Sequence, residues 1–303
     1  MFSSITLRQL KNSPILTLKH TRNFASTMEG FKELNVTMPK PFVYQVELNR
    51  PKKLNALNRA IWFEIGKCFD ILATKDDCRS IVLTGAGKIF SAGIDLPDMI
   101  QLGGELAKHE DVARKCKILE QMLKDYQDHF TALERCPKPV IAAVHSACIG
   151  GALDLILAAD IRMCSSDAWF QVKEAEIGMA ADMGTLQRLP RAIGNQSLVN
   201  ELCLTSRKVE PTEAKDCGLV SKVFDTRDSL VAGALEMAEH IASKSPVAVQ
   251  LTKRTLVHAR NNSTQTGLDF IRYWNMTMLQ SEDFVNAAMA QATKSPPPAF
   301  AKL

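Results

Sequence analysis

Three acidic residues lie among apolar and small residues in the middle of the chain: Asp154 in a predicted helix, Glu174 after a predicted strand, and Asp182 in the loop of residues 178–184. An isolated acid in such a setting is usually a helix cap or a solvated turn residue, and Asp182 could cap a helix that begins near Thr185. Three carboxyl groups gathered at one buried site would instead raise one another's pKa values toward neutrality. Such groups can take and give protons, so the trio predicts general acid–base chemistry.

Two glycine-containing segments, residues 85–96 and 139–154, place backbone amides where they could assist that chemistry. The glycines of each segment follow a buried strand, and glycine lets the backbone approach a ligand closely with its N–H groups directed at it. In the second segment the glycines also open a helix, whose N-terminus favours negative charge. Tight turns alone would explain either set of glycines. Neither segment carries the G-x-G-x-x-G dinucleotide signature or a phosphate-binding P-loop.

The elements that must position these residues alternate between strands and helices in the first part of the chain. Hydrophobic periodicity predicts strands over residues 42–48, 80–84, 139–144, 161–164 and 168–172, and helices over 57–73, 113–133 and 151–159. From Thr185 onward the pattern is almost wholly helical. Residues 101–117 are polar and are expected to form a surface segment near the mouth of the site. This order predicts an α/β core followed by a helical C-terminal segment.

The net charge of +4 belongs to the N-terminal leader rather than to the body of the protein. Residues 1–27 hold four basic residues and no acid, and the rest of the chain has equal numbers of basic and acidic residues. A neutral body argues against nucleic acid as a partner. The most apolar stretch, residues 139–159, is interrupted by His145 and Asp154, so it fits a buried strand and helix rather than a membrane span of about 20 apolar residues.

Eight cysteines are scattered along the chain without a C-x-x-C pair or the Cys/His spacing of a zinc site. They are expected to be reduced, buried thiols of an intracellular protein. His145, which precedes the second glycine-containing turn, is expected to be structural. No metal ion or redox cofactor is predicted from the sequence.

Both ends of the chain resemble organelle addresses. Residues 1–27 are amphipathic, basic and free of acids, which is the composition of a mitochondrial transit peptide that import would remove. Ala301, Lys302 and Leu303 resemble the peroxisomal S-K-L tripeptide, with alanine in place of serine. We therefore expect import receptors among the partners and a location in mitochondria and peroxisomes.

Three short motifs together carry a resemblance to a known family. Residues 49–57 are N-R-P-K-K-L-N-A-L, residues 91–96 are S-A-G-I-D-L, and residues 149–151 are I-G-G. Their identities, order and separation resemble those of the crotonase (enoyl-CoA hydratase/isomerase) superfamily, over nearly all of the chain after the leader. The resemblance implies an α/β fold, a crotonase-like spiral of ββα units over residues 28–223, with a helical C-terminal segment over residues 224–303.

The same resemblance implies where substrate binds. In this family the N–H groups that correspond to those of Ile94 and Gly151 hold the oxygen of an acyl-CoA thioester, and each such donor at a dry site stabilises an enolate oxygen by about 3 kcal/mol. The residues expected to bind substrate are Ala92, Gly93, Ile94, Asp95, Leu96 and Gly151. Lys52 and Lys53 are candidates for the phosphates of coenzyme A, although an exposed, solvated pair explains them equally well. No separate cofactor is implied, because coenzyme A is part of the substrate and its thioester makes the C2 proton acidic.

The pattern of acids separates branches of the family. Hydratases carry glutamate at the positions of Asp154 and Glu174 and glycine at that of Asp182, whereas this Asp-Glu-Asp trio resembles the dienoyl-CoA isomerase branch. That branch converts 3,5-dienoyl-CoA to 2,4-dienoyl-CoA. The resemblance implies that Glu174 removes a proton at C2, that Asp182 delivers one at C6, and that Asp154 orients or tunes the pair. The reverse assignment of Glu174 and Asp182 stays open. Ala152 departs from the branch, which commonly has a third glycine there.

Three alternatives share the same fold. An enoyl-CoA hydratase or a Δ3,Δ2-enoyl-CoA isomerase would differ chiefly at the position of Asp182. An RNA-binding member would use a lysine-rich helix, but the predicted helix over residues 57–73 carries only Arg59 and Lys67 as basic residues. Members of the superfamily are usually trimers or dimers of trimers, so a homotrimer or homohexamer is expected. The sequence does not fix the acyl chain length that the site accepts.

Overall fold

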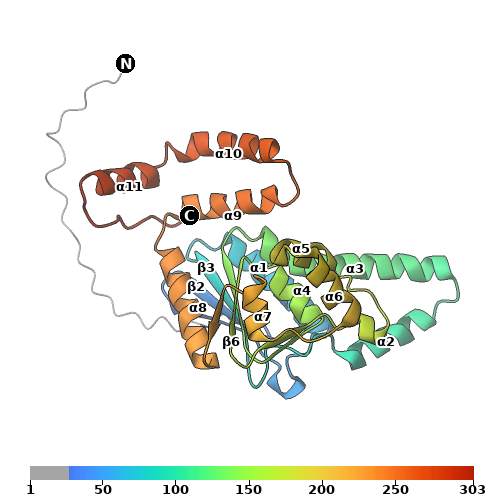
Figure 1. Cartoon of the computed structure of the whole chain (residues 1–303). Helices are drawn as coiled ribbons and strands as arrows, with labels where there is room; N and C mark the ends of the chain where they lie inside the picture. Colours follow the sequence, from blue (N-terminus) through green and yellow to red (C-terminus); the bar gives the residue numbers. More distant parts are fainter. Residues whose placement is uncertain (1–26) are drawn as a thin grey trace.

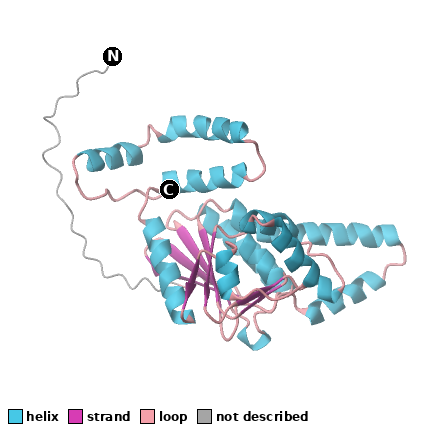
Figure 2. Cartoon of the chain, viewed as in Figure 1, coloured by secondary structure: helices cyan, strands magenta, loops and turns pink. Residues whose placement is uncertain are grey.

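The computed structural model describes residues 27–303 (Figure 1). The predicted transit peptide therefore lies outside the described residues, except for Thr27. Within the described part, strands and helices are interspersed up to residue 224, and helices alone follow (Figure 2). The mixed α/β core and the helical C-terminal segment expected from the sequence are both present.

Six strands form the main sheet in the order β1-β2-β3-β4-β6-β8, in which β1 and β2 are antiparallel and every other neighbouring pair is parallel. A second, two-stranded parallel sheet joins β5 to β7. The central strands β3 and β4 are buried throughout, and their near-continuous apolar sequences are typical of parallel strands covered on both faces. The strands are β1 (Leu34–Lys40), β2 (Val43–Leu48), β3 (Ser80–Gly85), β4 (Val140–Val144), β5 (Ala147–Ile149), β6 (Ile161–Ser165), β7 (Trp169–Gln171) and β8 (Lys222–Phe224).

Helices cover both faces of the sheet and make up the C-terminal part of the chain. The α-helices are α1 (Arg59–Thr74), α2 (Leu96–Ala107), α3 (Val112–Arg135), α4 (Gly151–Leu157), α5 (Thr185–Ile193), α6 (Gln196–Thr205), α7 (Pro211–Asp216), α8 (Arg227–Ala242), α9 (Pro246–Ala259), α10 (Thr264–Met278) and α11 (Glu282–Ala292). Two short 3-10 helices, η1 (Pro51–Lys53) and η2 (Glu174–Ile177), lie in loops beside the site described below.

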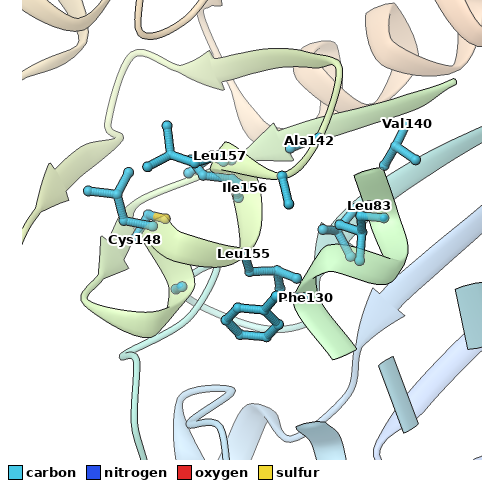
Figure 3. Close-up of a cluster of buried hydrophobic side chains, with 14 of the residues drawn as sticks. Leu83, Phe130, Val140, Ala142, Cys148, Leu155, Ile156 and Leu157 are labelled. Carbon is cyan, nitrogen blue, oxygen red and sulfur yellow. The ribbon is translucent and has the colours of Figure 1, made fainter. Parts of the chain in front are cut away.

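Residues alternate along the central strands between two hydrophobic clusters, as the two-residue period of a strand requires. Val82 and Ile141 belong to the cluster beneath α8. Leu83 and Val140 belong to the larger cluster, which they share with Phe130 of α3 and with α4 (Figure 3). Every residue of α4 is buried, so its first turn and the carboxyl group that it carries lie inside the protein.

Three strands and one helix were not predicted from the sequence. β5 and β8 span three residues each, which is too few for a periodicity to show. β1 lies at the edge of the sheet and alternates only weakly between buried and partly exposed residues. α2 takes up part of the polar surface segment expected over residues 101–117, and Gly103 and Gly104 in its interior weaken its helical pattern.

The C-terminal helices α9, α10 and α11 lie to one side of the sheet and extend away from it (Figure 1). Lys253 of α9 anchors this segment to the core. Its buried ammonium group donates to the carbonyl oxygens of Leu133 (2.9 Å) and Lys138 (3.0 Å) and forms an ion pair with Asp160 at 2.7 Å. Across residues 27–303, no helix combines the length and the apolar composition needed to cross a membrane.

Candidate active site

The two glycine-containing segments lie against each other. Ser91 and Cys148 form a parallel bridge, with backbone hydrogen bonds of 3.0 and 3.3 Å joining the two segments. Ile94 forms a second parallel bridge with Leu57, which precedes α1. The two motifs predicted to form an oxyanion hole are therefore neighbours in space, although they are far apart in the sequence.

Gly93 makes this close approach possible. Its φ angle is +83°, and a Cβ atom at this position would overlap the carbonyl oxygen of Ile149 and lie 3.7 Å from the amide nitrogen of Gly151. Any larger residue would have to push the two segments apart. Glycine therefore sets the spacing between the following amide, that of Ile94, and the amide of Gly151.

The N–H groups of Ile94 and Gly151 have no hydrogen-bond acceptor within residues 27–303. Gly151 is the first residue of α4, and a helix leaves its first N–H groups without an internal partner. The partial positive charge of the helix N-terminus adds to the attraction for an anionic oxygen. These two neighbouring groups can donate hydrogen bonds to the negative oxygen of an enolate, as the donors of an oxyanion hole must.

The motif at residues 49–57 fixes the first of the two segments. Asn55 is fully buried with a φ of 50°, and its side-chain amide donates to three backbone carbonyls of residues 86–90 at 2.7 to 3.0 Å. Arg50 forms an ion pair with Asp95 at 2.9 Å. The carboxylate of Asp95 is thus directed to Arg50, and its contribution to the site is to hold the loop.

Asp154, Glu174 and Asp182 lie close enough to act on one another through their charges. Asp154 is 1% exposed, Glu174 is 3% exposed, and Asp182 is partly buried. Burial raises the pKa of Asp154 to about 7, with further contributions from the charges of Glu174 and Asp182. Burial also raises the pKa of Glu174 and of Asp182, and the charge of Asp182 adds to the effect on Glu174. The structure therefore brings the three predicted acids together.

The carboxyl group of Glu174 lies beside the turn at Gly150. A Cβ atom on Gly150 would lie 3.0 Å from Glu174 Oε1. Glu174 Oε2 is buried and has no hydrogen-bond partner among the described residues. An unpaired buried oxygen costs free energy, which is expected where a substrate completes the bonding. Glu174 therefore has an oxygen available to take a proton close to the amide of Gly151.

Asp154 caps helix α5 from the neighbouring helix α4. Its Oδ1 atom accepts a hydrogen bond from the backbone N–H of Thr185 at 2.5 Å. The residue at the N-cap position of α5 is Gly184, which has no side chain to accept that bond. The alternative in which Asp182 caps this helix is therefore wrong. Asp182 instead lies on the wall of a cavity.

That cavity is largely apolar and lies between α1, α2, α3 and the loop of Asp182. Its lining residues are Leu57, Arg59, Trp62, Ile94, Asp95, Asp98, Met99, Leu102, Met122, Leu123, Tyr126, Met179, Asp182 and Met183. The cavity therefore connects Ile94 of the oxyanion segment to Asp182. Four of the lining residues are methionines, whose flexible side chains adapt to differently shaped apolar ligands. An apolar ligand in this cavity would lie between Ile94 and Asp182.

Sequence reasoning missed this apolar wall. Trp62 and Tyr126 stack with their ring centroids 4.8 Å apart, and Trp62 Nε1 donates to the carbonyl oxygen of Leu57 at 3.0 Å, which fixes the indole ring at the cavity. A helical stripe of apolar residues predicts burial, but it does not distinguish a side chain that faces the core from one that faces a cavity. The concentration of methionine near the predicted loops was the available signal.

The remaining candidates from the sequence lie outside this cavity. Lys52 and Lys53 are exposed in η1. His145 Nε2 lies 3.1 Å from the carbonyl oxygen of Gly87, which fits the structural role expected of it. In the part of the chain that the structure describes, no three His, Cys, Asp or Glu side chains are arranged to hold a metal ion.

Replacing Asp154 with asparagine is expected to stabilise the protein at alkaline pH. The folded-state pKa of about 7 lies above the ordinary value of 3.8, so the folded protein keeps a proton that the unfolded chain has released. This contribution to stability is fully present below pH 4 and is lost as the pH rises through about 7. A shift of this size corresponds to about 4 kcal/mol. Asparagine keeps an oxygen for the N–H of Thr185, so we expect Asp154→Asn to raise the free energy of unfolding at pH 8 by about 1–3 kcal/mol.

Urea unfolding at pH 5 and pH 8 measures this effect, because the gain should be clearly larger at the higher pH. An Asp154→Asn variant with the same change in unfolding free energy at both pH values would contradict the raised pKa.

Known proteins resemble this chain over nearly all of its described length. A family model described as enoyl-CoA hydratase/isomerase matches residues 40–298. A protein of Mus musculus named Delta(3,5)-Delta(2,4)-dienoyl-CoA isomerase, mitochondrial, is 46% identical over 296 residues, covering 97% of this chain and 89% of that protein. A protein of Arabidopsis thaliana named Delta(3,5)-Delta(2,4)-dienoyl-CoA isomerase, peroxisomal, is 44% identical, covering 91% of this chain and all of that protein.

A solved structure also shares the fold. The crystal structure of an enoyl-CoA hydratase from Bacillus anthracis superposes with a TM-score of 0.79 at 29% identity, covering 88% of this chain and 98% of that one. The residues matched by the family model include both glycine-containing segments and all three acids. The chain therefore belongs to the enoyl-CoA hydratase/isomerase family, the crotonase superfamily.

Proposed function

We propose that this protein is an isomerase that converts 3,5-dienoyl-CoA to 2,4-dienoyl-CoA in the β-oxidation of unsaturated fatty acids. The observation that carries the proposal is the placement of two carboxyl groups, one beside the turn at Gly150 and Gly151 and one on the wall of the apolar cavity. Glu174 lies at the turn that supplies the amide of Gly151, whereas Asp182 lines the cavity for the acyl chain. A shift of two conjugated double bonds needs proton transfer at two distant carbons, and a pair of acids placed in this way can serve both. The relatives from Mus musculus and Arabidopsis thaliana carry names of this activity.

The reaction moves one proton off the substrate and one onto it. Glu174, as the base, takes the proton from C2, and the electron pair spreads through the conjugated chain onto the thioester oxygen. The N–H groups of Ile94 and Gly151 hold that oxygen. Asp182, as the acid, gives its proton to C6, and the double bonds settle at C2 and C4. The active enzyme therefore has Glu174 ionised and Asp182 protonated, and exchange with solvent restores both states.

The position of Glu174 favours its assignment to C2 over the reverse assignment. C2 is bonded to the thioester carbonyl carbon, so it must lie beside the oxyanion donors. Glu174 Oε1 is next to Gly150, one residue from the Gly151 donor. Asp182 instead lines the apolar cavity, with Met179 and Met183. A carboxyl group in that position suits a carbon well along the acyl chain.

Hydration on the same fold is the second candidate, and the contacts of Asp154 disfavour it. A hydratase of this family uses two glutamates to hold and activate a water molecule. Here the shorter side chain of Asp154 accepts the N–H of Thr185. Glu174 then lacks a partner of matching length to share a water molecule, and Asp182 introduces a third carboxyl group into the site.

Coenzyme A enters the site as part of the substrate, so the reaction draws on no separate cofactor. The α-proton is acidified by the thioester itself, and the protein supplies donors and carboxyl groups. The exposed Lys52 and Lys53 of η1 are the candidates for its phosphates.

The proposal extends to the assembly of the protein and to its location in the cell. The C-terminal helices α10 and α11 expose several large apolar residues, among them Tyr273, Met276 and Phe284, as surfaces that contact another subunit do. A homotrimer or homohexamer would cover them. The relatives are named as mitochondrial and peroxisomal. The two terminal addresses would direct this chain to both compartments through the corresponding import receptors.

The assay that tests the function uses the purified full chain and three substrates. A 3,5-dienoyl-CoA should be converted to the strongly absorbing 2,4-dienoyl-CoA, with kcat/KM at least about a hundredfold above that for hydration of a 2-enoyl-CoA or isomerisation of a 3-enoyl-CoA. The rise in absorbance at the wavelength of the conjugated product is the measurement. Faster hydration than dienoyl isomerisation would replace this function with the hydratase alternative.

A further inference from the structure

The loop that carries Asp182, here the Asp182 loop (residues 178–184), is held from outside the cavity by α3. Gln127 Nε2 donates to the backbone carbonyl oxygen of Asp182 itself at 2.7 Å. This contact fixes the backbone of Asp182, a residue that lines the apolar cavity. The position of the carboxyl group therefore depends on contacts that never touch substrate.

Arg188 provides the second contact to the Asp182 loop. Its Nη1 atom donates to the carbonyl oxygen of Met183 at 3.4 Å, and a Cβ atom on Gly184 would overlap that same nitrogen. The guanidinium group thus lies directly over the end of the loop. Gly184 has a φ of +126°, which favours glycine, so the loop is shaped to admit this side chain.

Glu134 of α3 fixes the orientation of Arg188. Glu134 Oε2 accepts hydrogen bonds from Arg188 Nε at 3.1 Å and from Nη2 at 3.0 Å, and Nη2 also donates to Thr131 Oγ1 at 3.1 Å. Both charged side chains are about 15% exposed, so the pair is largely withdrawn from water. A planar guanidinium that donates to two fixed acceptors has one orientation, whereas a lysine would be held only as a point charge.

The other oxygen of Glu134 binds the C-terminal segment. Glu134 Oε1 accepts a hydrogen bond from Arg260, the residue that follows the last residue of α9. Burial raises the pKa of Glu134, but the charges and hydrogen bonds of Arg188 and Arg260 outweigh that effect and hold the pKa below its ordinary value. Glu134 is therefore a carboxylate at the pH of the reaction, joined to the Asp182 loop on one side and to α9 on the other.

We propose that Glu134 and Gln127 are positioning residues for Asp182, with Arg188 transmitting the restraint from Glu134 and Arg260 linking it to the C-terminal helices. The inference rests on the proposed role of Asp182 as the acid at C6. Proton delivery to a carbon requires the acid to lie within about 3–3.5 Å of it, and a misplacement of about 1 Å can cost about a hundredfold in rate. The network acts on the C6 step alone, because Glu174 and the oxyanion donors are held by other contacts.

The test separates the two proton transfers. Glu134→Gln keeps the shape of the side chain and removes its charge, and it is compared with Glu213→Gln, which breaks another arginine–glutamate pair, with Arg207 on the surface. We expect kcat for dienoyl isomerisation to fall by about 10- to 100-fold in Glu134→Gln, with KM within about threefold of the parent. Exchange of the C2 proton with D₂O, followed by mass spectrometry, should stay within about threefold. Glu213→Gln should leave all three quantities unchanged.

Gln127→Met is the second variant, because Gln127 is exposed and its replacement does not disturb a buried charge. We expect about a tenfold loss of kcat with the same retention of C2 exchange. The kcat of Arg260→Met should lie between that of the parent and that of Glu134→Gln, and Arg260→Lys should restore part of the lost kcat. Circular dichroism and thermal unfolding confirm that each variant is folded.

Two outcomes would overturn the inference. One is an unchanged kcat in both folded variants, Glu134→Gln and Gln127→Met. The other is a parallel loss of C2 exchange and isomerisation, which indicates general damage to the site. Asp182→Asn, assayed beside them, separates this result from a failure of the proposed function. If Asp182→Asn keeps its activity, Asp182 is not the acid at C6. If Asp182→Asn is inactive while Glu134→Gln and Gln127→Met have normal activity, only the positioning role is wrong.

Discussion

Dienoyl isomerisation is expected to fall by about a thousandfold when Asp182 is replaced with asparagine, while exchange of the C2 proton continues. Asparagine has the size of aspartate and no proton to give, so the dienolate forms and returns to substrate. Burial raises the pKa of Asp182, which is the direction that keeps an acid protonated at working pH. Product absorbance and deuterium incorporation at C2, measured on the same sample, give the two rates.

Each rate in the Asp182→Asn variant has a distinct meaning. Retention of more than about a tenth of the parent turnover would remove Asp182 from the mechanism. Loss of C2 exchange together with turnover would instead favour the reverse assignment, in which Asp182 is the base at C2. The exchange rate is an internal control, because it shows in the same molecule that substrate binds and that the oxyanion donors work.

The oxyanion segments were predictable from the sequence because their constraints are local. Gly93 must be glycine both for its positive φ and for its contact with Ile149, so the requirement appears directly as a residue type. The acids Asp154 and Glu174 also stood out, because charged residues are seldom buried without a reason. The resemblance of these motifs to those of the crotonase superfamily predicted which residues would form the site.

The shape of the acyl cavity could not be predicted in the same way. Trp62 and Ile65 both belong to the apolar stripe of α1, but only Trp62 lines the cavity. Helical periodicity gives the buried face of α1 and does not say whether α3 or a ligand will lie against a particular residue. The packing of α1, α2 and α3 against one another decides that, and it arises from contacts distant in sequence.

The network around Glu134 illustrates the same limit for polar residues. Glu134, Arg188 and Arg260 lie on three helices, and each separately is an ordinary charged residue of a solvated helix face. Their sequence positions give no sign that two guanidinium groups share one carboxylate. The coordinates also reassign the cap of α5 from Asp182 to Asp154, a bond between residues 31 positions apart.

The three clustered acids lower the stability of the fold and supply groups that can transfer protons. The pKa is raised for each of the three acids, Asp154, Glu174 and Asp182. Ionisation of any of them inside the fold therefore lowers the stability of the folded protein. Apolar residues at these three positions would give a more stable protein. The presence of the acids beside two unpaired amides is therefore better explained by proton transfer than by folding.

Replacing Glu174 with glutamine is expected to lower isomerisation by about a thousandfold or more and to abolish C2 exchange as well. No dienolate forms without a base at C2, so both rates should fall together, unlike the result for Asp182→Asn. Glu176→Gln is the matched control, because Glu176 lies on the same short helix η2 but is exposed and pairs with Lys173. It should leave both rates unchanged.

The Glu174→Gln variant should also be at least as stable as the parent above neutral pH. Glu174 Oε2 is buried without a partner, so the neutral amide removes a charge that the fold does not compensate. A variant that is more stable, binds substrate and does neither reaction would show that this carboxylate serves the chemistry rather than the fold. Persistent C2 exchange in Glu174→Gln would transfer the role of base to Asp154 or Asp182, and measuring exchange in Asp154→Asn would then decide between them.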